Sequence, residues 1–421
     1  MRTIVQSSIA ALGFLVLAQG VSAQETTVLR VSHGFEGHHA ELMEALVVRF
    51  EQKHPEIDVD LYLGGPNWDN HLQATLRAGI IDDLPDISHQ SLTFTRQYVS
   101  LGYAQPFTGL FDLATLAGKF GLPEPLLASA TFNGEVYGIP FGTTIPLIYY
   151  NMDIMRKAGY QKEELPATWP EVIAAAKAMA SVGGNTVGGY IEYDASNAWM
   201  FQNLLAAHGG TLTNETETEA AFISPAGTAA LKVLEDFAPA MNADMTRKQG
   251  RQAFNAGSVG LLVRSASGIK TISKAAQGKF EVRVGNFPVP SAKGKVVGAT
   301  HGVVLFAKAE AQRKAAAKYV EFLVGPEGQS VLAKETGYMP VSSVAVKDRE
   351  HFGDFYEKNP LQRGLLKMIP ITSDWYSFPN ETLRIFDIMK EQMRRVVTGE
   401  AKADAALNDM GAQVSPLMAS K

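Results

Sequence analysis

The residues best suited to chemistry stand together near the start of the chain. Three histidines fall within seven residues, at His33, His38 and His39, beside the carboxylates Glu36 and Glu41. Imidazole and carboxylate groups bind zinc and similar ions, so the segment raises the alternative of a metal-binding transport protein. Adjacent histidines rarely both face one metal, and the spacing matches no metal motif. We therefore assign no metal ligand here.

A hydrolase is the second alternative. The chain has no Gly-x-Ser-x-Gly elbow to present a serine nucleophile, no cysteine, and no carboxylates that the sequence can pair for acid and base catalysis. The glycine-rich stretch 183–189 lacks the lysine of a phosphate-binding loop and is expected to be a turn that ends a helix. We expect no enzymatic activity and no cofactor.

Composition limits the remaining classes. The absence of cysteine removes disulfides, thiolate metal sites and a lipid-bearing anchor. With 421 residues and 46% hydrophobic composition, the chain has enough apolar surface for two or three domains. The net charge of -5, without a block of like charges, gives no reason to expect nucleic acid as a partner.

The first 23 residues have the layout of a cleavable secretory signal. Arg2 precedes an apolar run at 10–18, and the small-residue site Val21-Ser22-Ala23 follows it. The apolar run is about half of the roughly 20 residues that a membrane span requires. We expect residues 1–23 to be removed and the mature protein to reside in the periplasm without a lipid anchor.

The next segments predict a strand, a helix and a second strand. Residues 28–31 are short and β-branched, residues 43–50 place apolar side chains at helical spacing, and residues 57–61 alternate apolar with acidic side chains. A strand-helix-strand unit implies a parallel sheet. Such sheets bind ligands at the carboxyl ends of their strands, where the loop 33–39 is expected to lie.

Later segments continue this alternation. Strands are expected at 258–264 and 303–306, and a surface loop at 211–219. Thr168 and Glu171 have the spacing of a capping box at a helix start. Asn133-Gly134 is a turn signal between two short β-branched runs, which indicates a hairpin.

Four segments in fixed order resemble the extracellular solute-binding proteins of carbohydrate importers. They read FNGEVYGIPF, IYYNMD, KAG and ATWPEV, and they lie at 132–141, 148–153, 157–159 and 167–172. Within that family, HGFEG at 33–37, NWDNHL at 67–72 and FYEKNP at 355–360 are most similar to glycerol-3-phosphate-binding proteins. The resemblance covers essentially the whole chain after the signal segment.

This resemblance implies an α/β fold of the two-lobe periplasmic-binding-protein type, similar to class II, with a ligand cleft between the lobes. It implies a first lobe of 24–141 plus about 300–342 and a second lobe of 142–299 plus about 343–421. The implied function is capture of a sugar, a polyol or a sugar- or glycerol-phosphate-like ligand by lobe closure. A monomer would deliver the ligand to an ABC permease and its ATPase complex.

The resemblance also implies a set of binding residues. Trp68 takes the place of a stacking aromatic and is expected in a loop after Gly64-Gly65-Pro66, while Thr144 and Ser265 take the places of hydroxyl donors. A neutral imidazole at the first strand's end can donate and accept hydrogen bonds. The full set of expected ligand-binding residues is His33, Trp68, Thr144, Trp199, Ser265, Tyr338 and Arg384.

Two departures from glycerol-phosphate binders leave the ligand open. Where those proteins carry an acid after a Pro-x-Ile strand, residues 88–93 contain none. Their phosphate-binding arginine follows a proline by three residues, a position that Thr382 occupies here. Arg384, two residues later, and Arg264, beside Ser265, are the alternative anion partners, because arginine recognises phosphate-like groups with two hydrogen bonds. The ligand classes left open are a sugar, a polyol, and a differently shaped phosphate or sulfonate.

Overall fold

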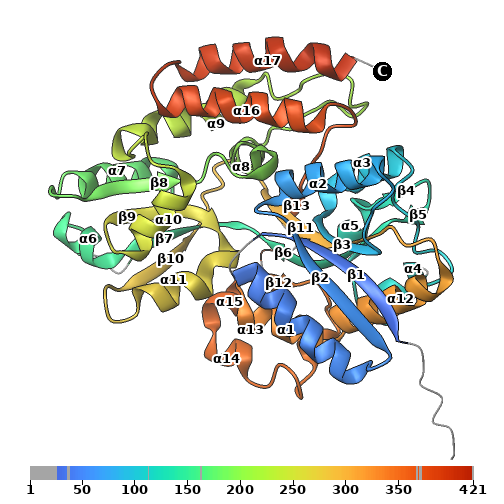
Figure 1. Cartoon of the computed structure of the whole chain (residues 1–421). Coiled ribbons are helices and arrows are strands. Elements are labelled where there is room, and N and C mark those ends of the chain that lie inside the picture. The colour runs from blue at the N-terminus through green and yellow to red at the C-terminus, as the bar shows by residue number, and fades with distance from the viewer. Residues whose placement is uncertain are drawn as a thin grey trace, which may run out of the picture.

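The computed structural model describes residues 26–35, 38–111, 113–161, 164–366, 368 and 372–419. The expected signal segment, 1–23, lies outside these residues. Figure 1 shows two α/β lobes side by side, with the two last helices lying across one of them. The α/β fold with two lobes that we predicted is confirmed.

The first lobe is built on a mixed sheet with strand order β12-β6-β11-β3-β1-β2. Strand β1 pairs in parallel with both β2 and β3, whereas β11 runs antiparallel between β3 and β6. A short strand, β13, pairs with the beginning of β11. The strands are β1 (Thr27–Gly34), β2 (Ile57–Gly65), β3 (Ile87–Ser91), β6 (Gly138–Thr144), β11 (Val296–Leu305), β12 (Met339–Pro340) and β13 (Thr372–Asp374).

The predicted strand-helix-strand unit is confirmed. Helix α1 (His38–Lys53) connects β1 to β2, and its apolar side chains at Met43, Leu46 and Phe50 are completely buried. The helix ends just before His54-Pro55, because the residue before a proline disfavours helical backbone angles. The carboxyl ends of β1, β2 and β3 therefore lie at one edge of the sheet.

Helices cover both faces of this sheet, and one of them differs from our prediction. Trp68 is the first residue of a helix and does not lie in a loop, because the Asn67 side chain accepts a hydrogen bond from the Asn70 amide and caps the helix at that point. The helices of this lobe are α2 (Trp68–Ile80), α3 (Thr95–Ser100), α4 (Leu113–Gly118), α5 (Glu124–Ala128), α12 (Glu310–Val324), α13 (Pro326–Glu335), α14 (Phe355–Lys358) and α15 (Pro360–Leu366). Helices α14 and α15 pack on α13 and β12, although the resemblance placed about 343–421 in the second lobe.

The predicted hairpin is also present in this lobe. Strands β4 (Thr131–Phe132) and β5 (Glu135–Val136) pair antiparallel around Asn133 and Gly134. Both turn residues have positive φ angles, 52° and 80°, as a tight two-residue turn requires.

The second lobe has a four-stranded sheet with the order β10-β7-β9-β8. The expected strand at 258–264 is β9, shifted by one residue, and the expected capping box of Thr168 and Glu171 is confirmed. The glycine-rich stretch begins as a turn after a helix, as predicted, but its last three residues belong to β8. The strands are β7 (Pro146–Asn151), β8 (Val187–Ile191), β9 (Val259–Ser265) and β10 (Val282–Asn286).

The helices of the second lobe surround this sheet. Two C-terminal helices, α16 and α17, pack on α9 of the same lobe, and α16 also contacts the short 3-10 helix at Ser196–Ala198 (Figure 1). The lobe's helices are α6 (Met152–Lys157), α7 (Trp169–Ala180), α8 (Trp199–Ala207), α9 (Pro225–Phe237), α10 (Arg247–Asn255), α11 (Ile269–Ala276), α16 (Thr382–Val397) and α17 (Ala403–Ala419).

The connections between the lobes are short. Strand β6 belongs to the first sheet and β7 to the second, and only Ile145 separates them. The chain returns through β11, which was predicted only at 303–306 but begins at Val296. An apolar cluster that includes Trp68, Trp199 and Trp375 also spans the two lobes. The two sheets are therefore held close at a narrow junction.

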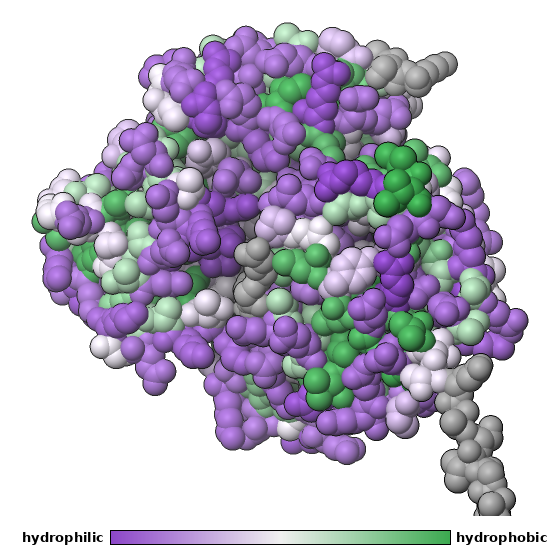
Figure 2. Space-filling view, viewed as in Figure 1, coloured by the Kyte–Doolittle hydropathy of each residue, from purple (hydrophilic) through white to green (hydrophobic). Residues whose placement is uncertain are grey.

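The outer surface of the first lobe includes an apolar area. Hydrophobic side chains gather over α1, β1 and β2 in Figure 2, where Val28, Val48 and Leu63 are exposed. Of the helices in the described ranges, each is either too short or too polar to cross a bilayer.

Candidate ligand-binding site

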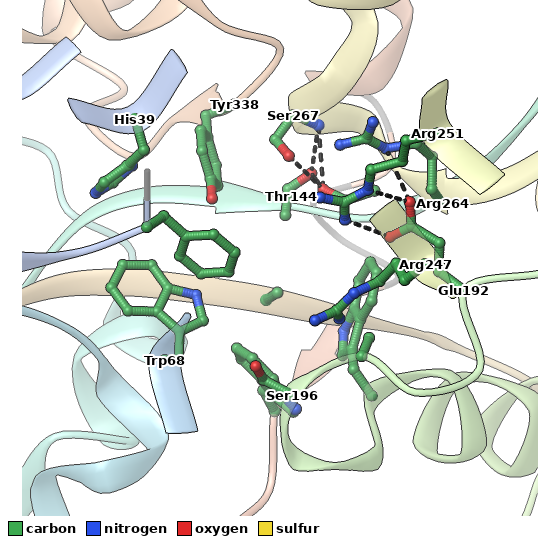
Figure 3. A pocket seen from close by; sticks show the side chains of 16 residues that line it. His39, Trp68, Thr144, Glu192, Ser196, Arg247, Arg251, Arg264, Ser267 and Tyr338 are labelled. Carbon is green, nitrogen blue, oxygen red and sulfur yellow. Dashed lines mark hydrogen bonds and ion pairs between the residues drawn. The ribbon is translucent and has the colours of Figure 1, made fainter. Parts of the chain in front are cut away.

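A pocket lies between the two lobes and receives side chains from both (Figure 3). Its enclosed volume is about 70 Å³, below the roughly 300–1,000 Å³ of typical small-molecule sites, and the empty space reaches about 620 Å³ only when the open solvent at its mouth is included. The lining residues are Phe35, His39, Trp68, Thr144, Glu192, Ala195, Ser196, Trp199, Arg247, Arg251, Arg264, Ser265, Ser267, Ala299, Tyr338 and Trp375.

The first lobe contributes an aromatic wall. Trp68 meets Phe35 edge-on, with ring centroids 4.9 Å apart, and stacks on the buried ring of His301 at 5.8 Å. Gly34 permits this packing, because a Cβ there would stand 2.9 Å from the Trp68 ring. Tyr338 extends the wall, with its ring centroid 4.4 Å from that of His301. Such a wall suits the apolar face of a small carbon skeleton.

The hydroxyl groups lie where the lobes join. Thr144 ends β6 of the first lobe, Ser265 ends β9 of the second, and their hydroxyl oxygens are 2.8 Å apart. The Ser265 hydroxyl is also 2.8 Å from that of Ser267, whose amide donates to the Thr144 oxygen. These groups form one hydrogen-bonded network that spans both lobes and faces the pocket.

The second lobe contributes a charged wall, opposite Trp68 in Figure 3. Glu192 follows β8 and is 3% exposed. Arg251, on α10, donates two hydrogen bonds of 2.6 Å to the two oxygens of this carboxylate. Arg264, on β9, lies 3.5 Å from one of them. Arg247 approaches the pocket from α10, and its Nε is 3.9 Å from an oxygen of Asp194.

The pKa of Glu192 is lowered to about 2. Burial of the carboxyl group acts to raise the pKa, and the guanidinium groups of Arg251 and Arg264 more than offset that effect. Burial raises the pKa of Tyr338 to about 12, so its hydroxyl stays protonated and able to donate.

The depressed pKa of Glu192 makes stability depend on pH in a defined direction. Its contribution to the free energy of unfolding is present in full above its usual pKa of 4.5 and is lost as the pH falls toward 2. The expected loss is about 3 kcal/mol. Urea unfolding of the wild type and of Glu192→Gln at several pH values isolates this group. The difference in free energy of unfolding between the two proteins should become smaller as the pH falls. A difference that does not change with pH would contradict the lowered pKa of Glu192.

A strained segment lies beside the charged wall. Asn197 and Ala198 both adopt left-handed backbone angles, with φ of 54° and 46°. Such angles destabilise a residue with a side chain by about 1 kcal/mol or more. The Asn197 amide donates to the Thr93 hydroxyl of the first lobe at 2.7 Å. The strain is thus associated with a contact between the lobes at the pocket, next to Ser196.

The structure brings five of the expected binding residues together. Trp68, Thr144, Trp199, Ser265 and Tyr338 all line the pocket. The Trp199 indole additionally donates to the Val297 carbonyl at 3.1 Å, which fixes its ring.

His33 does not line the pocket. It is 4% exposed at the end of β1, and its Nδ1 atom lies 3.3 Å from the Gly34 carbonyl oxygen. The pocket-lining histidine is His39, in the first turn of α1. The position of His33 on the strand was predicted correctly, but its side chain lines a separate groove along α1 and β2.

Arg384 is a second correction. Helix α16 begins at Thr382. With this starting residue, the side chains of Ile385 and Phe386 face the core and that of Arg384 faces solvent. The Arg384 side chain is 67% exposed, and its nearest carboxylate is that of Glu381, 3.9 Å away. The expected anion partner on this segment is therefore absent from the pocket.

Several pocket residues escaped the sequence reasoning. They are Phe35, Glu192, Ser196, Arg247, Arg251, Ser267 and Trp375. The spacing of Arg247 and Arg251 was the available signal, because residues four apart share one face of a helix. Glu192 and Trp375 carry no local signal.

Two of the histidines that raised the metal alternative, His33 and His39, lie near each other. The rings of His33 and His39 are 6.1 Å apart. Among the residues that the structure describes, no three histidine or carboxylate side chains are grouped to hold an ion. Glu36 lies outside the described ranges.

Two α/β lobes around a pocket that both of them line define a protein that captures a small molecule between its halves. The chain belongs to the family of bacterial extracellular solute-binding proteins, whose model matches residues 45–362. Its function is thus solute binding, and neither the metal-transport nor the hydrolase alternative is supported.

Individual relatives agree with this assignment. The sn-glycerol-3-phosphate-binding periplasmic protein UgpB of Pectobacterium atrosepticum is 25% identical over 428 residues, covering 96% of this chain and 94% of the relative. UgpB of Agrobacterium fabrum is 26% identical over 398 residues, covering 90% and 83%. The predicted resemblance to glycerol-3-phosphate-binding proteins is confirmed.

Solved structures share the fold. UgpB of Mycobacterium tuberculosis, in complex with glycerophosphocholine, has a TM-score of 0.77 at 22% identity and covers 91% of this chain and 98% of its own. The GacH receptor of Streptomyces glaucescens has a TM-score of 0.80 at 19% identity and covers 93% and 98%. These likenesses establish the two-lobe architecture.

Proposed function

We propose that the protein is the periplasmic binding component of an ABC importer. It captures a sugar, a polyol or a glycerol-phosphate-like solute without converting it, by closure of its two lobes. As a monomer, it delivers the solute to a membrane permease and its ATPase complex. The names of the relatives support this class of ligand, since they bind glycerol 3-phosphate, and one neighbour holds glycerophosphocholine.

The division of the pocket wall between the lobes carries the proposal. Aromatic rings such as Trp68 and Tyr338 come from the first lobe, and charged side chains such as Arg251 and Glu192 from the second. A solute can contact both walls only when the lobes are together. Such a solute shifts the population toward the closed form by the free energy of the added contacts.

Ligand screening tests the proposal directly. The mature protein would be heated with sn-glycerol 3-phosphate, glycerophosphocholine, glycerol and maltose in turn. A compound at about 100 times its dissociation constant stabilises the folded protein by about 2.7 kcal/mol, so its melting temperature rises. Trp68, Trp199 and Trp375 are three of the four tryptophans and line the pocket, so binding should also change the intrinsic fluorescence.

Small-angle scattering would then show whether binding closes the lobes. The radius of gyration should fall in the presence of the compound that raises the melting temperature. Zinc added alone is the control for the metal alternative and should leave the melting temperature unchanged. Superimposable scattering curves, with no thermal or fluorescence response to any organic compound, would contradict the proposal.

A further inference from the structure

The charged wall of the pocket contains more positive than negative groups. Three arginines and one glutamate line it, and Arg251 occupies both oxygens of that glutamate. Asp194, outside the lining, lies 3.9 Å from Arg247. Arg264 lies 3.5 Å from Glu192 and shares that carboxylate with Arg251, which makes the shorter contacts to it.

Arg264 is also poorly supplied with hydrogen bonds. It is 5% exposed, and its Nε atom is buried without a hydrogen-bond partner among the described residues. Burial, followed by repulsion from Arg251, lowers its pKa. A guanidinium has five N–H donors, and burying them unpaired is unfavourable. A bound group with several acceptor oxygens would satisfy the donors and the charge together.

The surroundings of Arg264 are shaped to hold its side chain in the pocket. Gly268 has no side chain, and a Cβ there would stand 2.6 Å from Cζ of Arg264. The backbone φ at Gly268 is -82°, which any residue adopts, so the missing side chain is required for space. Ser265 and Ser267 follow Arg264 closely in the sequence, and both line the pocket.

We propose that the captured solute carries a tetrahedral oxyanion, and that Arg264 binds it together with Arg251 and Arg247. Phosphate and sulfonate present several acceptor oxygens to a planar guanidinium, which recognises them with paired hydrogen bonds. The aromatic wall around Trp68 then contacts the carbon skeleton. This inference rests on the proposed function. The proposal places the binding of the anion at β9 and α10 of the second lobe. The resemblance had placed it at Arg384, at the beginning of α16.

Matched ligands test the charge requirement. Glycerol, sn-glycerol 3-phosphate and 2,3-dihydroxypropane-1-sulfonate share a three-carbon skeleton and differ in the acidic group. At least one charged member should bind roughly tenfold or more tightly than glycerol. Calorimetry with the phosphate and the sulfonate separates the two sources of the oxyanion.

The Arg264→Met variant tests the residue. Removing Arg264 takes away a buried charge that Arg251 repels and leaves Glu192 paired with Arg251, so the melting temperature of the unliganded protein should stay equal or rise. Affinity for the charged ligand should fall roughly tenfold or more. An arginine with a purely structural role would give the opposite pattern, a lower melting temperature with unchanged affinity, and that result would overturn the proposal.

Further variants give independent readouts. Gly268→Ala should displace the guanidinium and weaken charged-ligand binding with Arg264 still present. Arg247→Met, at a side chain that is 21% exposed, provides a second charge deletion in a more tolerant position. Arg384→Ala is the matched control, since it removes an exposed arginine, and it should leave affinity unchanged. Loss of binding in Arg384→Ala with retention in Arg264→Met would overturn the assignment.

Failure of this inference is distinguishable from failure of the proposed function. If maltose or glycerol binds and closes the lobes while neither charged compound does, the oxyanion proposal is wrong and the proposed function of solute capture is supported. If no compound in the panel changes the melting temperature, both fall.

Discussion

Glu192→Gln is expected to lower the free energy of unfolding of the unliganded protein by about 3–5 kcal/mol. The substitution preserves the shape of the side chain and removes its charge. Arg251 then keeps at most one of its two hydrogen bonds, to the amide oxygen, and faces an NH2 group at the other position, while Arg264 loses the carboxylate charge at 3.5 Å. The buried guanidinium of Arg264 and the partly buried guanidinium of Arg251 both lose this anion, which explains why the effect exceeds that of a surface ion pair.

Denaturant titration at neutral pH measures this change. Glu391→Gln is the matched control, because Glu391 also pairs with an arginine, Arg394, but its side chain is 51% exposed. That control should change stability by at most about 1 kcal/mol. An oxyanionic ligand should stabilise Glu192→Gln more than the wild type, since it would supply the missing charge. Equal stability of the two glutamine variants would contradict our account of the charged wall.

Trp68→Ala is expected to weaken solute binding roughly tenfold or more and to lower the free energy of unfolding by about 3 kcal/mol. Both effects follow from the position of the ring. It lines the pocket, and it is also 4% exposed and packed against Phe35, His39 and His301. Its removal takes away a contact surface for the ligand and leaves a cavity in the apolar cluster between the lobes.

Trp169→Ala separates these two effects. Trp169 is also 4% exposed and is also the first residue of a helix after a capping residue, but it packs on Phe287 away from the pocket. This variant should lose similar stability and keep its affinity, measured by calorimetry with the compound that gave the largest thermal shift. Wild-type affinity in Trp68→Ala would remove Trp68 from the binding site.

Local sequence patterns were sufficient for the first strand-helix-strand unit of the first lobe. The helical spacing of Met43, Leu46 and Phe50 placed α1, because all three side chains face one core. Trp68 was assigned to a loop because Gly64-Gly65-Pro66 signals a turn. The turn is followed directly by α2, because the Asn67 side chain caps the helix. This single side-chain hydrogen bond decides where the helix begins, and the turn signal alone does not reveal it.

The pocket could be predicted only in part. The aromatic and hydroxyl residues follow from the resemblance, because they lie beside recognisable motifs. The charged wall combines Glu192, Arg247, Arg251 and Arg264, which are far apart in the sequence. They meet because β8 and β9 pair in parallel and α10 packs against β9. Arg384 was expected in the pocket but lies outside it for a related reason. The starting residue of α16 determines which of its side chains point inward, and the sequence did not reveal that residue.

The position of β11 has a consequence for synthesis of the protein. It lies between β3 and β6 in its sheet, although β7, β8, β9 and β10 all precede it in the sequence. A ribosome that has translated the chain through β10 has therefore delivered every strand of the second sheet but left a vacancy in the first. Pairing across such sequence distances is slow, so we expect the first sheet to close after all strands of the second sheet are available, whereas α16 and α17 join the second lobe last.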